Sequence, residues 1–225
     1  MQRRLMPAFP TIHDLAASAH GEETRLKLIH AATPEFIEQG FRAARVQQIA
    51  ARAGVRLSAI NYHFGGKEGL YLAVLRYHGD LAITQQPLLS DSELPLPDRF
   101  RFLIHSVLLR MLDEQQGCRI AQLVLREMVN PTAALDDIYH RFQQPQLQQM
   151  LSLLQQILPE ETPDTLLRCT LSMMSQCIIY VLARPLIVRT SPHLLTDPGW
   201  LEEIENHIVR FSWAGLMALR EEPHA

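Results

Sequence analysis

Residues 39–71 read QGFRAARVQQIAARAGVRLSAINYHFGGKEGLY, and this stretch decides the fold of the N-terminal part of the chain. Its apolar spacing predicts two short helices, at about 46–52 and 57–63. A tight turn joins them, and Gly54 in that turn can take the positive φ that such a turn requires. A further helix is expected to begin near Lys67. The segment is therefore predicted to be a helix-turn-helix.

The predicted helix-turn-helix is basic. Between Phe41 and Phe64 the only charged side chains are arginines, apart from one histidine, and there is no Asp or Glu. Such a segment suits the recognition of a DNA major groove. The cations can reach phosphates, and a small helix can present polar side chains to the base edges. The arginines are Arg42, Arg45, Arg52 and Arg56.

The composition and charge of the whole chain indicate what surrounds this segment. The chain has 225 residues, of which 47% are hydrophobic and 20% charged, as in an ordinary globular protein. The formal net charge of −3 is uneven, because residues 1–21 carry +1, residues 22–80 carry +2 and residues 81–225 carry −6. The asymmetry favours a DNA-facing head on an acidic body.

The cysteines and the N-terminus indicate the compartment. Cys118, Cys169 and Cys177 have no metal-ligand spacing and fit reduced thiols of a cytoplasmic protein, either in a core or as redox sensors. No run approaches the roughly 18 apolar residues of a membrane span, and the first 20 residues do not resemble a signal peptide. We expect a mobile arm there, with one helical turn from Thr11.

Helical spacing of apolar residues continues through residues 22–225, and no stretch holds the two-residue period of a strand. The sequence predicts an all-α protein with a three-helix helix-turn-helix head and a larger helical ligand and dimerisation domain. Prolines at 34, 145 and 185 should kink or divide their helices. The expected domains are an arm at 1–20, a DNA-binding domain with connecting helix at 21–80, and a ligand-binding and dimerisation domain at 81–225. The expected helices are 23–39, 46–52, 57–63, 67–85, 97–115, 118–130, 133–156, 162–189 and 199–220.

One of these helices is apolar nearly all round. Residues 166–188 read LLRCTLSMMSQCIIYVLARPLIV. A helix that is hydrophobic on every face must be buried on every face. We therefore expect the helices at 162–189 and 199–220 to bury one side in their own core and the other against a second copy, as a symmetric four-helix interface.

The head resembles a known family. The residues in register are Gly40, Ile49-Ala50, Ala53-Gly54-Val55, Ile60-Asn61-Tyr62-His63-Phe64 and Lys67-Glu68. They resemble the DNA-binding domain of TetR/AcrR-type transcriptional regulators. The segments REMVNPTAALD and MSQCIIY resemble a subfamily that includes regulators of drug-efflux and export genes. The resemblance implies an all-α homodimer, a palindromic DNA operator, and release when a small effector occupies the C-terminal domain.

Physical reasoning beside the resemblance suggests roles in DNA contact. Asn61 can offer a donor and an acceptor to an adenine edge, or be a solvated surface residue. His63 can bond a phosphate or support the fold. Lys67 can form a phosphate site with the N-terminus of its helix, or be solvated. The predicted DNA-binding residues are Arg45, Gln47, Arg56, Leu57, Ser58, Ala59, Asn61, Tyr62, His63 and Lys67.

Two positions depart from the family pattern at helix starts. Members often have Thr where this chain has Ala44-Arg45, and a capping Ser or Asn where it has Arg56. An arginine reaches phosphates but cannot accept from the free N–H groups of a helix start. The departures predict a less stable head with stronger and less selective phosphate contact.

Polar groups inside apolar helices are the candidates for an effector site. An internal ion pair with Glu127 is the alternative role of Arg126. Gln176 and Tyr180 share a face that could meet either a cavity or a partner chain. Methionines suit an adaptable pocket but are more often ordinary core. The predicted ligand-binding residues are Gln122, Arg126, Met173, Gln176 and Tyr180.

Catalytic motifs are absent from the sequence: there is no HExxH, no nucleophile elbow and no phosphate-cradling glycine loop. We expect no enzyme, no cofactor and no metal. The sequence favours a ligand-responsive DNA-binding regulator, a repressor controlling efflux or detoxification genes. The alternative is a protein-binding adaptor that keeps the fold without binding a specific operator.

Overall fold

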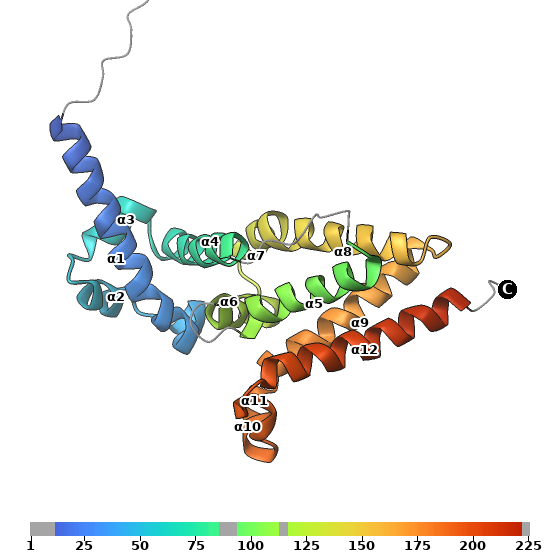
Figure 1. Ribbon diagram of the computed structural model, residues 1–225. Helices are drawn as coiled ribbons and strands as arrows, with labels where there is room; N and C mark the ends of the chain where they lie inside the picture. Colours follow the sequence, from blue (N-terminus) through green and yellow to red (C-terminus); the bar gives the residue numbers. More distant parts are fainter. Residues whose placement is uncertain (1–11, 86–93, 113–116, 222–225) are drawn as a thin grey trace, which may run out of the picture. The chain divides into compact units, whose positions relative to one another are not determined.

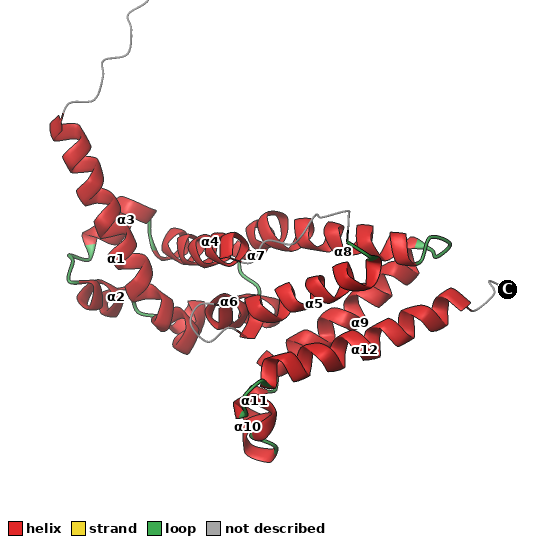
Figure 2. Cartoon of the chain, viewed as in Figure 1, coloured by secondary structure: helices red, strands yellow, loops and turns green. Residues whose placement is uncertain are grey.

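The computed structural model describes residues 12–85, 94–112 and 117–221 (Figure 1). Within these ranges every regular element is a helix and there is no strand, which confirms the predicted all-α fold class (Figure 2). The chain divides into two compact units. Met1–Val74 is called the head below, and Leu75–Ala225 the body.

The head consists of three helices and the start of a fourth. They are α1 (Ile12–Ala43), α2 (Val46–Ala53), α3 (Ser58–Phe64) and the first turns of α4 (Lys67–Gln85). The core contains Leu28, Phe36, Ile49 and Ile60, each at most 1% exposed. The apolar stripe of α1 therefore packs against α2, and α2 in turn packs against α3. Val55 and Phe64 are only half-buried.

Glycines shape two of the bends in the head. Gly54 follows α2 with φ 68°, in the left-handed region, and its N–H donates to the carbonyls of Ala50 and Ala51. This is the positive φ predicted for the inter-helix turn. Gly40 has φ 73° and ψ 170° and breaks α1 three residues before its end. The non-helical backbone inside α1 is thus at Gly40, while Pro34 lies within helical backbone.

The N-terminal part of α1 is longer than expected. The sequence predicts one helical turn from Thr11, whereas the helix runs continuously from Ile12. Residues 1–11, the first part of the expected arm, lie outside the described residues.

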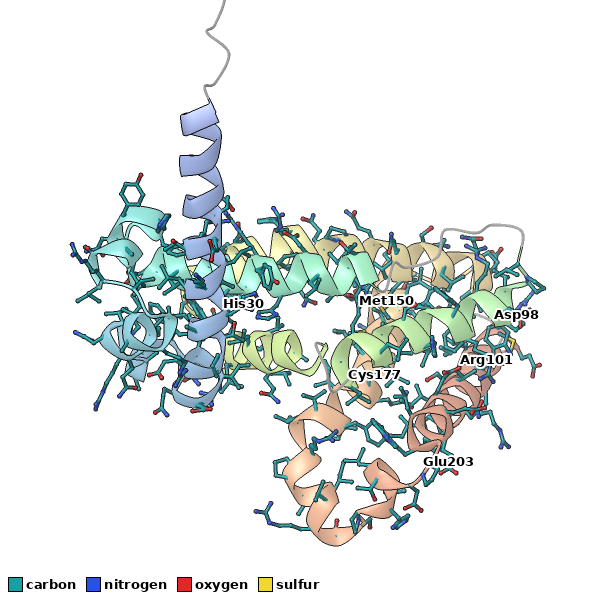
Figure 3. All side chains as sticks on the ribbon, turned by 60° about the vertical axis from the view of Figure 1, so that its left-hand side comes forward. His30, Asp98, Arg101, Met150, Cys177 and Glu203 are labelled. Carbon is teal, nitrogen blue, oxygen red and sulfur yellow. The ribbon has the colours of Figure 1, made fainter. Side chains whose placement is uncertain are left out.

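The body is a helical bundle around one hydrophobic core. α5, α8, α9 and α12 supply most of its buried side chains, and Leu195 on α11 adds another. Met150 on α8 and Cys177 on α9 lie inside this core (Figure 3). The remaining elements surround this core. The elements that follow α4 are α5 (Leu96–Leu112), α6 (Gly117–Val129), α7 (Ala134–Ile138), a π-helical turn η1 (Tyr139–Gln143), α8 (Gln144–Ile157), α9 (Pro163–Leu182), α10 (Arg184–Thr190), α11 (His193–Thr196) and α12 (Trp200–Glu221).

Prolines divide two of the predicted body helices. The helix expected at 133–156 contains the π-helical turn η1 directly before Pro145, which occupies the first turn of α8. A proline lacks a backbone N–H and therefore cannot donate to the preceding turn of a helix. A π-helical turn before the proline, or a position in the first turn of a helix, reduces the number of backbone hydrogen bonds that are lost. The helix expected at 162–189 ends at Leu182, and Pro185 lies in the first turn of α10.

Two Arg–Asp ion pairs link the C-terminal half of α4 to α7 and η1. Arg76 on α4 donates to Asp137 on α7, with Nε at 2.9 Å from Oδ2. The charges are reversed in the second pair, where Arg141 donates to Asp80 at 2.9–3.1 Å. The hydrogen bond from Arg76 lowers the pKa of Asp137, so the Arg76–Asp137 pair is ionised at neutral pH.

A buried carboxylate joins α5 to α12. Glu205 is 8% exposed and accepts from Arg101 Nη1 at 3.0 Å, and its Oε2 lies 2.6 Å from His105 Nδ1. A buried carboxylate requires such partners, since an unpaired charge in a protein interior is costly. The pairing fixes the register of these two helices.

α9 is the apolar helix singled out in the sequence. Leu166, Thr170 and Cys177 face the core, whereas Leu171 is 57% exposed and Ile179 46% exposed. Among the described residues it is the one helix whose length and apolarity would permit a membrane span, and its core-facing side chains are those of a helix inside a bundle. In a single chain, one apolar face of α9 is therefore exposed to solvent.

Candidate nucleic-acid interface and ligand cavity

The exposed side chains of α3 gather on one face. Ile60 is buried, and Leu57, Ser58, Asn61 and Tyr62 are exposed, as the helical period requires. Tyr62 is 86% exposed, which is unusual for an aromatic side chain. A short helix with a buried aliphatic side and an open face of hydroxyl, amide and phenol groups suits contact with a DNA groove.

The other predicted DNA-binding residues surround this face. Three of them are exposed: Arg45 directly before α2, Gln47 on α2, and Arg56 in the turn that leads to α3. Ala59 is half-buried. His63 is also half-buried and stacks edge-on against Tyr62, with the ring centroids 4.9 Å apart. This contact supports the structural role that was left open for His63, and leaves its ring partly accessible.

Lys67 begins α4, as predicted, but its ammonium also has partners within the head. Nζ donates to the carbonyl of Arg42 at 3.0 Å and lies 5.1 Å from the centre of the Phe41 ring. Phe41 in turn contacts Tyr71, with ring centroids 5.1 Å apart. An ammonium has three donors, so these contacts orient Lys67 and leave donors for a phosphate.

Neither short helix is capped by its own side chain. Arg45 precedes α2 in extended conformation without a side-chain cap, as its sequence predicts. α3 begins at Ser58 and is preceded by Leu57, one residue later than the expected cap at Arg56, and it too lacks a side-chain cap. The absence of local caps is therefore confirmed for both helix starts.

A residue distant in sequence compensates at α2. Glu35 on α1 is 2% exposed, and its Oε1 accepts the backbone N–H of Arg45 at 3.1 Å. Its Oε2 lies 3.7 Å from Nη2 of Arg52, and Nη1 of Arg52 donates to the carbonyl of Ala31 at 3.1 Å. The carboxylate also lies at the positive end of the α2 dipole. Arg45, through its backbone N–H, and Arg52, through its guanidinium, thus hold the helix-turn-helix against α1.

We expect Glu35→Ala to destabilise the protein by about 1–3 kcal/mol, since it removes the acceptor of a buried N–H and a partner of Arg52. Urea or thermal unfolding of the full-length protein measures this. Glu38→Ala removes an exposed carboxylate from the same helix and should change the stability by no more than about 0.5 kcal/mol. Equal effects of the two substitutions would contradict the capping role.

The body contains a largely apolar cavity of two adjoining compartments. Their volumes are about 110 Å³ and about 270 Å³. The first lies among α4, α5, α6, η1, α8 and α9, and the second extends toward α7. Both compartments are lined by Val124, Met128, Gln143, Gln146, Met174 and Ile178.

The residues predicted from sequence to bind a ligand do not line this cavity. Met173 is buried in the core of the body. Gln176 donates to Ser212 Oγ at 3.0 Å and lines a surface hollow between α9 and α12. Tyr180 is half-buried against the core, where burial raises its pKa. Gln122 is half-buried and Arg126 exposed on α6.

Sequence reasoning missed the polar residues that do line the cavity. Arg110 on α5, Gln143 on η1 and Gln146 on α8 converge there, and Arg110 Nη1 lies 3.4 Å from Gln146 Oε1. Glu127, considered as an ion-pair partner of Arg126, is 1% exposed and accepts from the N–H and hydroxyl of Thr132. It stabilises the turn between α6 and α7.

Two of the cysteines have environments that disfavour reactivity. Cys177 is fully buried, and burial raises the pKa of its thiol to about 12. Burial also raises the pKa of Cys169. Since the thiolate is the reactive form, these environments favour the interpretation as core thiols. The side chain of Cys118 lies outside the described residues.

Family models match both units of the chain. Residues 28–74 match the N-terminal domain of bacterial regulatory proteins of the tetR family. Residues 96–216, more than half of the chain, match the C-terminal domain of the HTH-type transcriptional dual regulator CecR. The helix-turn-helix on an all-α body thus defines a TetR-type transcriptional regulator. The chain belongs to this family, and within it to the group with a CecR-type C-terminal domain.

Individual relatives agree with this assignment. The dual regulator CecR of Shigella flexneri is 33% identical over 140 residues, which are 58% of this chain and 62% of that protein. The activator FasR of Mycolicibacterium smegmatis is 44% identical over 59 residues, 26% of this chain and 27% of that one. The chain therefore spans less than two thirds of the length of these curated relatives.

Solved structures share the fold at low identity. AibR in complex with isovaleryl coenzyme A and operator DNA has a TM-score of 0.64 and 16% identity, covering 84% of this chain and 97% of that chain. A TetR-like regulator from Rhodococcus sp. RHA1 has a TM-score of 0.62 and 15% identity, covering 86% and 96%. At this identity the likeness is one of fold.

Proposed function

We propose that the protein is a ligand-responsive repressor whose homodimer binds a palindromic operator and is released by a small-molecule effector. The observation that carries the proposal is the exposed face of α3, with Asn61 and Tyr62 at its centre, on a head matched to the tetR family. Support for an effector comes from the cavity in the body. The solved relative AibR is described with both operator DNA and a coenzyme A thioester.

The proposed homodimer rests on the open face of α9 and α12. Leu171, Ile179 and Phe211 are 46–66% exposed on these two helices. Large apolar side chains this exposed support an interaction site on these helices. A two-fold dimer places two helix-turn-helices one helical turn of DNA apart, which explains the expectation of a palindromic operator.

The regulated genes are proposed to serve efflux or detoxification. Support comes from the segments Arg126–Asp136 and Met174–Tyr180, both inside the region that matches the CecR C-terminal domain. The relative CecR is named a dual regulator, so transcription of the target genes should be followed for both repression and activation.

We expect Asn61→Ala to weaken binding to the operator by about 1–3 kcal/mol per half-site and to reduce discrimination against random DNA, because an amide can pair with an adenine edge in a bidentate manner. Gel-shift titration with the DNA that flanks the gene, at several salt concentrations, measures both effects. The dimer should remain intact, since the Asn61 side chain is exposed on α3.

Gln148→Ala removes an exposed amide from α8 in the body and should leave operator affinity unchanged. Equal affinity of the unmodified protein for operator and random duplex would contradict specific operator binding. No salt-dependent binding to any duplex would favour the adaptor that keeps the fold without binding an operator.

A further inference from the structure

Methionines are concentrated on the walls of the cavity in the body. Four of the eight methionines in the sequence line its two compartments, and two of these four line both compartments. A thioether is polarizable, adapts to irregular shapes and makes favourable contacts with the edge of an aromatic ring. Walls of this composition favour a ligand with an aromatic body. The four residues are Met111, Met128, Met150 and Met174.

Two aromatic side chains from η1 belong to the same walls. Phe142 lines the first compartment and Tyr139 the second. A Cβ atom at Gly79 on α4 would overlap the ring of Phe142, so this ring is packed closely against the backbone of α4. A ligand ring can contact such side chains edge-on or in an offset stack, which adds to the gain from burying its area.

The charged groups on the walls do not favour a charged ligand. None of the lining residues described is an aspartate or glutamate, so an ammonium group would lose its water without gaining a counter-charge. Arg110 already donates to Oε1 of Gln146 at 3.4 Å, and it has a further interaction within the protein. An anion would have to compete with these contacts. The walls therefore favour an uncharged molecule.

Gln143 offers the ligand a polar group. It lies on η1, is half-buried and lines both compartments. The oxygen of Gln146 is used by Arg110, so Gln143 is the amide assigned to the ligand. An amide provides two donors and an acceptor, and a polar group of this kind in an apolar wall orients a bound molecule. A carbonyl or hydroxyl group on the ligand would be its partner.

The size of the cavity limits the aromatic body. An apolar cavity of roughly 150 Å³ can hold a molecule of benzene. The compartments here have volumes of about 110 Å³ and about 270 Å³. We infer that the cavity binds an uncharged aromatic molecule of one or two rings whose carbonyl or hydroxyl group bonds the side chain of Gln143. The inference rests on the proposed effector-responsive function and names the chemistry of the effector.

Isothermal titration calorimetry of the full-length protein at neutral pH with matched two-ring compounds tests the ligand class. The probes are 2-naphthol, naphthalene, decahydro-2-naphthol, 2-naphthoate and 2-naphthylmethylammonium. 2-Naphthol should bind at least about tenfold more tightly than either ion, because the charged groups lose their water in the cavity. It should bind about threefold or more tightly than decahydro-2-naphthol, which lacks the aromatic rings.

Gln143→Leu tests the polar contact. The unmodified protein should bind 2-naphthol about threefold or more tightly than naphthalene, through the hydrogen bond to Gln143. In the variant this preference should disappear, while naphthalene binds as before or more tightly. Gln149→Leu makes the same change at an exposed position of α8 and should retain the preference.

Met174→Leu tests the contact with the rings at nearly constant volume. Loss of the sulfur should weaken binding of 2-naphthol about twofold or more and leave binding of decahydro-2-naphthol unchanged. Met173→Leu is the matched control, because Met173 is the preceding residue of α9 and is buried in the core, outside the lining of both compartments. It should bind both compounds as the unmodified protein does.

Several outcomes would overturn the inference. They are no binding of 2-naphthol, equal or tighter binding of either ion or of decahydro-2-naphthol, a Gln143→Leu protein that keeps the preference for 2-naphthol over naphthalene, and equal behaviour of the two methionine variants. Operator binding is measured on the same preparations by gel shift. A protein that binds its operator but not 2-naphthol refutes the ligand class alone, whereas failure to bind any DNA refutes the proposed function.

Discussion

Gly69→Ala is expected to destabilise the head by about 3 kcal/mol or more and to abolish operator binding. A Cβ atom at Gly69 would lie well inside the van der Waals distance of the backbone carbonyl oxygen of Phe64. Backbone atoms cannot rotate away as a side chain can, so the junction between α3 and α4 must shift. Thermal unfolding followed by circular dichroism, together with gel-shift titration, measures both effects.

Gly21→Ala is the matched control in the same unit. Among the described side chains its Cβ would meet His63 Cε1, at an ordinary contact distance of 3.9 Å. Alanine has the higher helix propensity, so this variant should be neutral or more stable by up to about 1 kcal/mol. A Gly69→Ala protein with the melting temperature and operator affinity of the unmodified protein would show that the close approach at Phe64 is not required.

Phe211→Glu is expected to convert the proposed homodimer into monomers and to lower operator affinity by about 100-fold or more. Phe211 lies on the open face of α12 with 66% of its surface exposed, and stacks on His207 with ring centroids 6.0 Å apart. A carboxylate at this position would be buried without a partner in a four-helix interface. A monomer binds one half-site and therefore lacks the gain in affinity that comes from binding two half-sites at once.

Light scattering after size-exclusion chromatography measures the mass, and gel shift measures the affinity. Val129→Glu places the same charge on another exposed apolar residue, 71% exposed at the end of α6, and should change neither quantity. If Phe211→Glu remained a dimer with full operator affinity, the interface would have to lie on other helices.

The elements that the sequence predicted well are those fixed by local chemistry. Gly54 takes the positive φ that the inter-helix turn requires, and the residue type alone indicates this. The helical period predicted the two short helices, whose buried faces carry Ile49 and Ile60. The position of α3 and its exposed side chains follow from the same period.

The remaining features depend on contacts between distant residues. The cap of α2 comes from Glu35, ten residues before the N–H that it accepts, and no rule of local spacing assigns it. Gln176 looked like a ligand residue because it is polar on an apolar helix, yet Ser212 on α12 is its partner. Arg110 was overlooked because an arginine near the end of an amphipathic helix is usually solvated.

The bond from Glu35 to Arg45 bears on how regulators of this kind can be recombined. A chimaera joined at residue 44 would transfer both short helices, α2 and α3. It would not transfer Glu35, whose carboxylate accepts the N–H at the start of α2. A junction placed before α1 transfers the reading surface together with its support. The smallest exchangeable unit of DNA specificity in this protein is therefore α1 to α3, larger than the helix-turn-helix itself.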